Sequence, residues 1–79
     1  MTILLYRRPG CPLCDDAEAL LDELGVAFLR ANILEDERTF VRYRYRIPVL
    51  DIDGAEVLEL RFDMMQLQAA LAAAGVTTK

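Results

Sequence analysis

Two cysteines three positions apart, Cys11 and Cys14, are the residues of this chain best suited to carry chemistry. Disulfide exchange needs a thiolate that attacks and a second thiol close enough to displace the resulting mixed disulfide. The C-x-x-C spacing supplies both, so we predict that Cys11 is the nucleophile and Cys14 the resolving thiol. A bond between cysteines this close in sequence would constrain little of the unfolded chain, which favours a chemical role over a structural one.

The start of a predicted helix provides a favourable place for the attacking thiolate. Pro12 suits the first helical position, and apolar residues then recur at helical spacing, at Leu13, Ala17, Leu20, Leu21 and Leu24. Unpaired N–H groups at a helix N-terminus carry partial positive charge and stabilise an anion there. Arg8, with its neighbour Arg7, lies just upstream and is expected to add positive potential around Cys11.

Pro48 is a second signal, independent of the cysteines. It stands where an apolar strand begins, and at such a position an X-Pro bond can be held cis and a missing N–H leaves a neighbouring backbone group free to meet a ligand. We therefore predict a cis bond between Ile47 and Pro48. Arg46 approaches this bond and is a candidate to bind an anion, whereas Tyr43 and Tyr45 are expected to be packing residues.

Length, composition and charge restrict the classes of function. With 79 residues, 54% hydrophobic and 28% charged, the chain predicts a single domain over residues 1–79. Its apolar runs are far shorter than the ~20 residues of a membrane span, and the N-terminus is unlike a secretory signal, so we expect no membrane partner and a cytoplasmic location. A net charge of −4 argues against a nucleic-acid partner, and the absence of histidine removes Cys–His catalysis and His-ligated zinc.

The remaining pattern predicts the element order β-α-β-α-β-β-α. Asp53-Gly54 predicts a type I′ hairpin turn, and Asp63 with Gln66 predicts a capping box at the start of the last helix. Residues 77–79 are expected to fray. Strands are expected at residues 2–6, 26–29, 49–52 and 55–60, and helices from residues 11, 35 and 63.

Together these features resemble the glutaredoxins, most closely short bacterial glutaredoxin-like proteins. The resemblance rests on Tyr-Arg-Arg-Pro-Gly after the first strand, Cys-Pro-Leu-Cys at the helix start, Arg-Ile-Pro-Val-Leu at 46–50 and the Asp-Gly hairpin, and it covers nearly the whole chain. It implies an α/β thioredoxin fold, with a four-stranded mixed sheet in the order 2-1-3-4 flanked by three helices. It also implies that Cys11 is nucleophilic, that Cys14 resolves, and that a cis Pro48 lies beside them.

The resemblance extends to a second set of residues and to partners. It implies glutathione as a thiol donor or mixed-disulfide partner, and the candidate residues for substrate or glutathione are Arg46, Ile47, Arg61 and Asp63. Two departures bear on this. Leu13 stands where typical glutaredoxins have a tyrosine, and 61–63 stands where they have a Gly-Gly pair, so the close backbone approach that glycine permits is lost.

The leading hypothesis is a monomeric thiol–disulfide oxidoreductase that serves electron transfer and cell redox homeostasis. Its substrates would be disulfide-containing proteins or small thiols such as glutathione, with electrons from a thiol reductant system, and with no resident cofactor or metal. The alternative is a metal or iron–sulfur binding module. Two thiolates are an incomplete site where four ligands are usual, so that module would form as a dimer or with external thiols. A redox-inert binding domain of the same fold is a third possibility.

Overall fold

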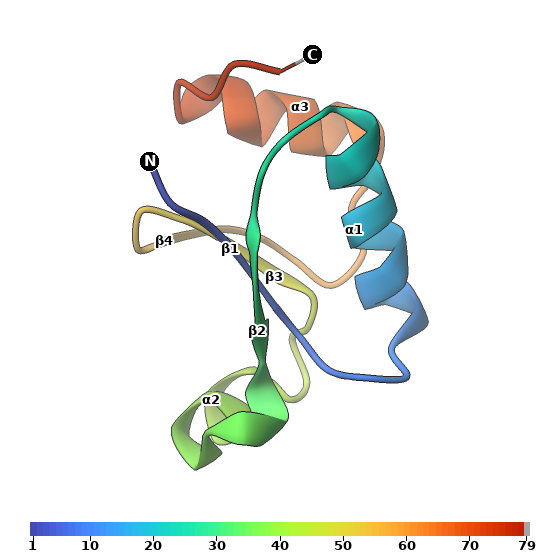
Figure 1. The fold of residues 1–79 in the computed structure, drawn as a ribbon, viewed down its shortest axis with the longest axis vertical. Helices are drawn as coiled ribbons and strands as arrows, with labels where there is room; N and C mark the ends of the chain where they lie inside the picture. The colour runs from blue at the N-terminus through green and yellow to red at the C-terminus, as the bar shows by residue number, and fades with distance from the viewer. Residues whose placement is uncertain (79) are drawn as a thin grey trace.

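A four-stranded mixed sheet lies at the centre of the structure, a computed structural model that describes residues 1–78 (Figure 1). The strand order is β2-β1-β3-β4, with β1 and β2 parallel and the other neighbours antiparallel. This is the order that the resemblance implied. The strands are β1 (Ile3–Arg7), β2 (Leu29–Asn32), β3 (Val49–Ile52) and β4 (Ala55–Glu59).

Helices cover both faces of this sheet because the side chains of its inner strands alternate. Leu5 and Leu50 point into a core shared with α1 (Pro12–Glu23) and α3 (Met64–Ala73). Tyr6 and Val49 point to the other face, where they pack with Tyr43 of α2 (Glu37–Tyr43). Figure 1 shows α1 and α3 together, with α2 apart from them. The longest helix has 12 residues, so none in the described part of the chain could cross a bilayer.

Local signals set the ends of these elements as the sequence predicted. Asp63 and Gln66 form a full capping box at the start of α3. Asp53 and Gly54 both have positive φ, 53° and 89°, as a type I′ turn between β3 and β4 requires. Lys79, the last residue of the expected domain and of the expected frayed end, lies outside the described residues.

Several expectations about the fold were wrong in detail. The second strand does not occupy 26–29 but begins at Leu29, where its parallel pairing with β1 starts. Val26, shortly after the end of α1, is instead buried in the core. The second helix does not begin at residue 35 but at Glu37, because an unpredicted 3-10 turn, η1 (Ile33–Glu35), precedes it. Tyr45 is not a packing residue: it is 79% exposed, beyond the end of α2.

Candidate active site

The two cysteines differ in accessibility. Cys11 is the N-cap of α1 and is partly exposed, whereas Cys14, inside the first turn, is fully buried; both are free thiols. The backbone N–H of Cys14 donates to the sulfur of Cys11 over 3.2 Å, so the helix start directs a donor at that sulfur. Pro12 occupies the first turn, where its missing N–H removes no hydrogen bond. The arrangement lets a substrate reach Cys11 first.

The environment of Cys14 keeps its thiol protonated. Burial, and next a hydrogen bond with Cys11, raise the pKa of Cys14 to about 12, although the backbone N–H of Arg8 and the charge of Arg7 act in the opposite direction. A protonated Cys14 can share its proton with the Cys11 sulfur. The N–H of Arg8 and the charge of Arg7 favour a Cys14 thiolate, so they would act on this thiol in any state in which the hydrogen bond with Cys11 is lost.

The loop before β3 brings the predicted proline to the cysteines. The Ile47–Pro48 bond is cis, as predicted. Ile47 is buried in one cluster with Cys14 and Val49, and Cys11 packs against the same cluster from its edge. The C-x-x-C helix start and the cis-proline loop are therefore neighbours in space.

The end of β4 holds this loop through its backbone. The N–H of Leu60 donates to the carbonyls of Arg46 and Pro48, over 3.1 and 2.9 Å. To do so Leu60 adopts φ 62°, a left-handed conformation that costs a non-glycine residue roughly 1–2 kcal/mol. Strain of this kind is typical of functional sites. Leu60 directly precedes residues 61–63, the segment where the family's Gly-Gly pair was expected.

Side-chain contacts also hold the cis-proline loop against β4. Arg46 forms ion pairs with Glu56 and Glu59 of β4, the latter at 2.9 Å. The hydroxyl of Tyr43 donates to Glu56 over 2.8 Å, and burial, followed by this bond, raises the pKa of Tyr43, so the hydroxyl remains a donor. Tyr43 also stacks on Tyr6, with ring centres 4.2 Å apart. The charge of Arg46, a candidate anion-binding group, is thus already matched by carboxylates.

Of the two arginines before Cys11, Arg7 holds α1 in place. Its guanidinium pairs with Asp15 at 3.0 Å and with Glu18, and Arg30 of β2 pairs with Glu18 at 2.7 Å. Burial alone would raise the pKa of Glu18, but the bonds from Arg30 and Arg7 lower it below its ordinary value. The side chain of Arg8 is exposed and, within residues 1–78, forms no ion pair. Sequence spacing could not distinguish these two roles.

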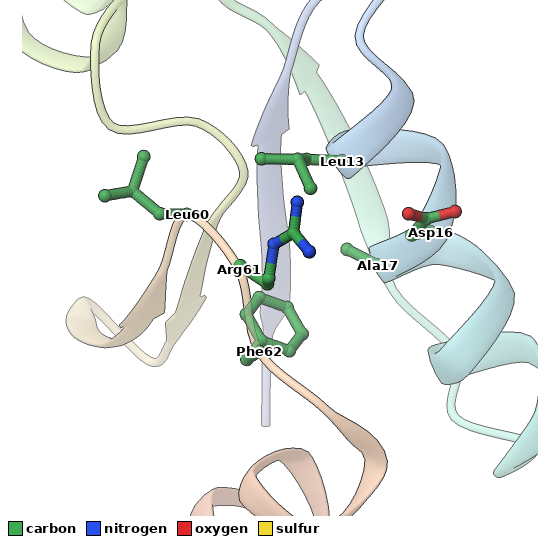
Figure 2. Close-up of a pocket in the computed structure, with 6 residues that line it drawn as sticks. All are labelled: Leu13, Asp16, Ala17, Leu60, Arg61 and Phe62. Carbon is green, nitrogen blue, oxygen red and sulfur yellow. The ribbon is translucent and has the colours of Figure 1, made fainter.

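A small hollow adjoins Leu13, which stands between the two cysteines in the sequence. It lies between α1 and the segment that joins β4 to α3, and its volume is about 70 Å³ (Figure 2). Figure 2 shows the guanidinium of Arg61 next to Leu13, while the side chain of Leu60 points away from Leu13. Asp63, by contrast, has its carboxylate bonded to the N–H of Gln66 in its own helix. The lining residues are Leu13, Asp16, Ala17, Leu60, Arg61 and Phe62.

Metal ligands are sparse around the pair. Across residues 1–78, no three His, Cys, Asp or Glu side chains gather in a way that could hold a metal ion. The alternative of a metal or iron–sulfur module therefore needs ligands from a second chain or from external thiols.

Comparisons with known proteins agree with this geometry. The family model of the Glutaredoxin-like domain (DUF836) matches residues 2–72, a stretch that includes both cysteines, the cis-proline loop and most of α3. The solution structure of protein XcR50 from X. campestris is 37% identical over 98% of this chain and 100% of its own, with a TM-score of 0.84. Glutaredoxin from Brucella melitensis is 26% identical over 95% of this chain and 82% of its own, with a TM-score of 0.65. The thioredoxin-like protein BC3987 is 28% identical over 89% and 100%, with a TM-score of 0.68.

Proposed function

The chain belongs to the glutaredoxin-like domain family of the thioredoxin superfamily, and on this basis we propose that it is a thiol–disulfide oxidoreductase that works through Cys11 and Cys14. The observation that carries the proposal is the asymmetry of the pair: a partly exposed sulfur at a helix start, and a buried, protonated thiol one turn further on, beside a cis proline. Thiol–disulfide exchange needs an accessible attacking sulfur, and a second thiol close by can resolve the mixed disulfide.

In the first half of the reaction, the thiolate of Cys11 attacks one sulfur of a substrate disulfide. A bond forms between Cys11 and that sulfur, the substrate S–S bond breaks, and the other half leaves as a thiolate that takes a proton from solvent. The N–H of Cys14, 3.2 Å from the sulfur of Cys11, supports the thiolate before the attack. The cis-proline loop, tied to β4 by Leu60 and Arg46, lies beside the reacting sulfur.

In the second half, Cys14 loses its proton to water and attacks the sulfur of Cys11. The Cys11–Cys14 disulfide forms, the mixed disulfide breaks, and the remaining half of the substrate leaves as a thiolate that is then protonated. Overall the substrate gains two electrons and two protons, and the protein dithiol loses them. Two equivalents of a low-molecular-weight thiol, which becomes its own disulfide, return the protein to the dithiol form. Glutathione is the proposed donor, and the cytoplasm the proposed compartment.

Trapping of the mixed disulfide tests this mechanism. Cys14→Ser should accumulate a stable mixed disulfide on Cys11 when the reduced protein meets hydroxyethyl disulfide, and intact-mass measurement should show one adduct per chain. Cys11→Ser, the matched control, should accumulate none in the native state because Cys14 is buried. Equal adduct formation by the two variants would contradict the assigned order of attack.

A further inference from the structure

Positive charge is concentrated on α2 and the turn that follows it. Residues 38–46 include four of the chain's nine basic residues and no acidic residue, although the whole chain has a net charge of −4. The acidic residues at 35–37 directly precede this segment. A protein that is acidic as a whole therefore presents a basic surface here, on the face of the sheet opposite α1 and α3 (Figure 1).

Two arginines of this segment are matched by carboxylates and two are not. Arg42 and Arg46 form ion pairs with glutamates of β4. Arg38 and Arg44 are exposed and, within residues 1–78, pair with no carboxylate. The charges of these two side chains are therefore available to a partner.

Aromatic rings hold the side chain of Arg44 in place. Its guanidinium carbon lies 4.7 Å from the ring centre of Tyr45 and 5.7 Å from that of Phe40. Stacking of this kind uses the flat face of a guanidinium and leaves the N–H groups at its edge free to bind a carboxylate through two parallel hydrogen bonds. Arg44 is thus oriented before a ligand arrives, which lowers the entropy lost on binding.

Exposed apolar surface adjoins this charge. Tyr45 is 79% exposed, and Val41, four positions earlier in the chain, is 62% exposed. Tyrosine and arginine are enriched among the residues that contribute most of the binding energy in protein–protein interfaces. An exposed tyrosine beside a stacked arginine therefore suits a protein partner better than a small anion, which would meet the charge alone.

This surface adjoins the reactive cysteines through the cis-proline loop. Phe40, one of the two stacked rings, packs against the buried cluster that contains Cys14, and Cys11 packs against the same cluster. Tyr45 lies three residues before Pro48 in the sequence. A protein bound at this surface can therefore place its disulfide beside Cys11.

We propose that the surface formed by Arg38, Val41, Arg44 and Tyr45 docks an acidic segment of a protein partner, and holds it beside the cis-proline loop while the disulfide of that partner reacts with Cys11. This rests on the proposed function, since it names the class of partner for the same cysteines. A nucleic acid is also an anion, but its charge extends along the whole molecule and would meet the acidic residues at 35–37 and the net negative charge of the protein.

Charged peptide disulfides test this docking surface. Each is a symmetrical disulfide of a blocked peptide, in which a Gly-Ser spacer joins one cysteine to a tract of Glu, of Gln or of Lys. Second-order rate constants for reduction by the dithiol protein are measured by stopped flow in low and in high salt. Each is divided by the rate with dithiothreitol, a neutral reductant, and by the rate of the same variant with hydroxyethyl disulfide, which corrects for any change in its own thiols.

The net charge and the docking surface predict opposite orders of reactivity. If the net charge of −4 alone acted, the Lys peptide would react fastest and the Glu peptide slowest. With docking at α2, the Glu peptide should react about tenfold faster than the Gln peptide in low salt, and high salt should bring this ratio close to one. Arg44→Gln should lower the ratio about twofold to fivefold, as for the loss of an exposed ion pair, and the double variant with Arg38→Gln should nearly abolish it.

Gln68→Glu is the matched control for charge. It changes the net charge by the same amount as Arg44→Gln, but at an exposed position of α3, across the sheet from α2. It should leave the ratio of the Glu to the Gln peptide unchanged. Tyr45→Ala should lower this ratio because it removes a ring that holds Arg44, whereas Tyr45→Phe should retain it.

The remaining outcomes separate the two proposals. If hydroxyethyl disulfide is reduced but the Glu peptide reacts no faster than the Gln peptide, the docking surface is refuted and the proposed function stands. The inference is also wrong if Gln68→Glu lowers the ratio as much as Arg44→Gln does, or if Arg44→Gln slows the reduction of oxidised glutathione as much as that of the Glu peptide. If no disulfide is reduced, the proposed function itself fails.

Discussion

Replacing Cys11 by serine should leave a protein whose one remaining thiol is nearly inert to alkylation while the chain is folded. Cys14 has no exposed surface, and its surroundings disfavour the thiolate, which is the reactive form. In the unfolded chain the same thiol should behave as an ordinary cysteine. The contrast between the folded and unfolded forms of Cys11→Ser therefore measures how strongly the fold protects Cys14.

The size of the contrast follows from the pKa of Cys14. Burial is the largest reason that this pKa rises from its ordinary 9.0 to about 12. At neutral pH a rise of this size lowers the thiolate fraction about 1000-fold. The hydrogen bond with Cys11 is lost in the variant, but burial is kept, so alkylation should still be slower by at least about 100-fold in the folded protein.

Iodoacetamide labelling followed by mass spectrometry provides the assay. Rates for Cys11→Ser are measured from pH 7 to 10 in buffer and in denaturant, with Cys14→Ser as the matched control that keeps the accessible thiol. The folded Cys11→Ser rate should still be rising at pH 10, because the Cys14 thiolate is not yet fully formed. Folded and unfolded rates within about tenfold of each other, or a plateau near pH 9, would refute the assigned protection of Cys14.

Three further predictions concern stability. Asp63→Ala removes the N-cap of α3 and should lower the free energy of unfolding by about 0.5–2 kcal/mol in urea titrations; an unchanged value would mean that the capping box contributes nothing. Glu18→Gln should destabilise the protein at pH 7 by roughly 1–3 kcal/mol, because it removes the charge that Arg7 and Arg30 pair with. The pKa of Glu18 is lowered in the folded protein, so its ionised form stabilises the fold above pH 4.5, and this stability is lost as the pH falls through the lowered pKa. The two proteins should converge once the pH falls below the lowered pKa of Glu18, and a difference that stays constant with pH would contradict the ion-pair origin. Leu60→Gly should be more stable than Leu60→Ala by about 1 kcal/mol, since only glycine relieves φ 62°; the reverse order would be inconsistent with a left-handed Leu60.

Features specified by a few adjacent residues were predictable from the sequence. The Asp53-Gly54 turn needs two residues that tolerate positive φ, and the capping box needs only Asp63 and Gln66 at the correct spacing. The cis bond before Pro48 followed from a proline at the entry to an apolar strand. Each of these signals is local, so tertiary contacts did not override it.

Features that depend on contacts between residues distant in the sequence were not predictable. Arg46 lies two residues before Pro48 in the sequence, but Glu56 and Glu59, which pair with its charge, come from β4. Nothing in the residue type marks Leu60 for a left-handed conformation, because the two carbonyls that its N–H meets belong to the cis-proline loop. The second strand began later than its apolar run because pairing with β1, which decides where a strand lies, is a long-range property.

The central claim, that Cys11 and Cys14 form a redox-active pair, is tested most directly by equilibrium in glutathione redox buffers. Free thiols are trapped by alkylation after an acid quench, and each species is identified by mass. We expect an intramolecular Cys11–Cys14 disulfide with a definable midpoint, together with a glutathione adduct on Cys11 when Cys14 is replaced by serine. Thiols that stay free across the whole range, or that oxidise only between molecules, would contradict the dithiol mechanism.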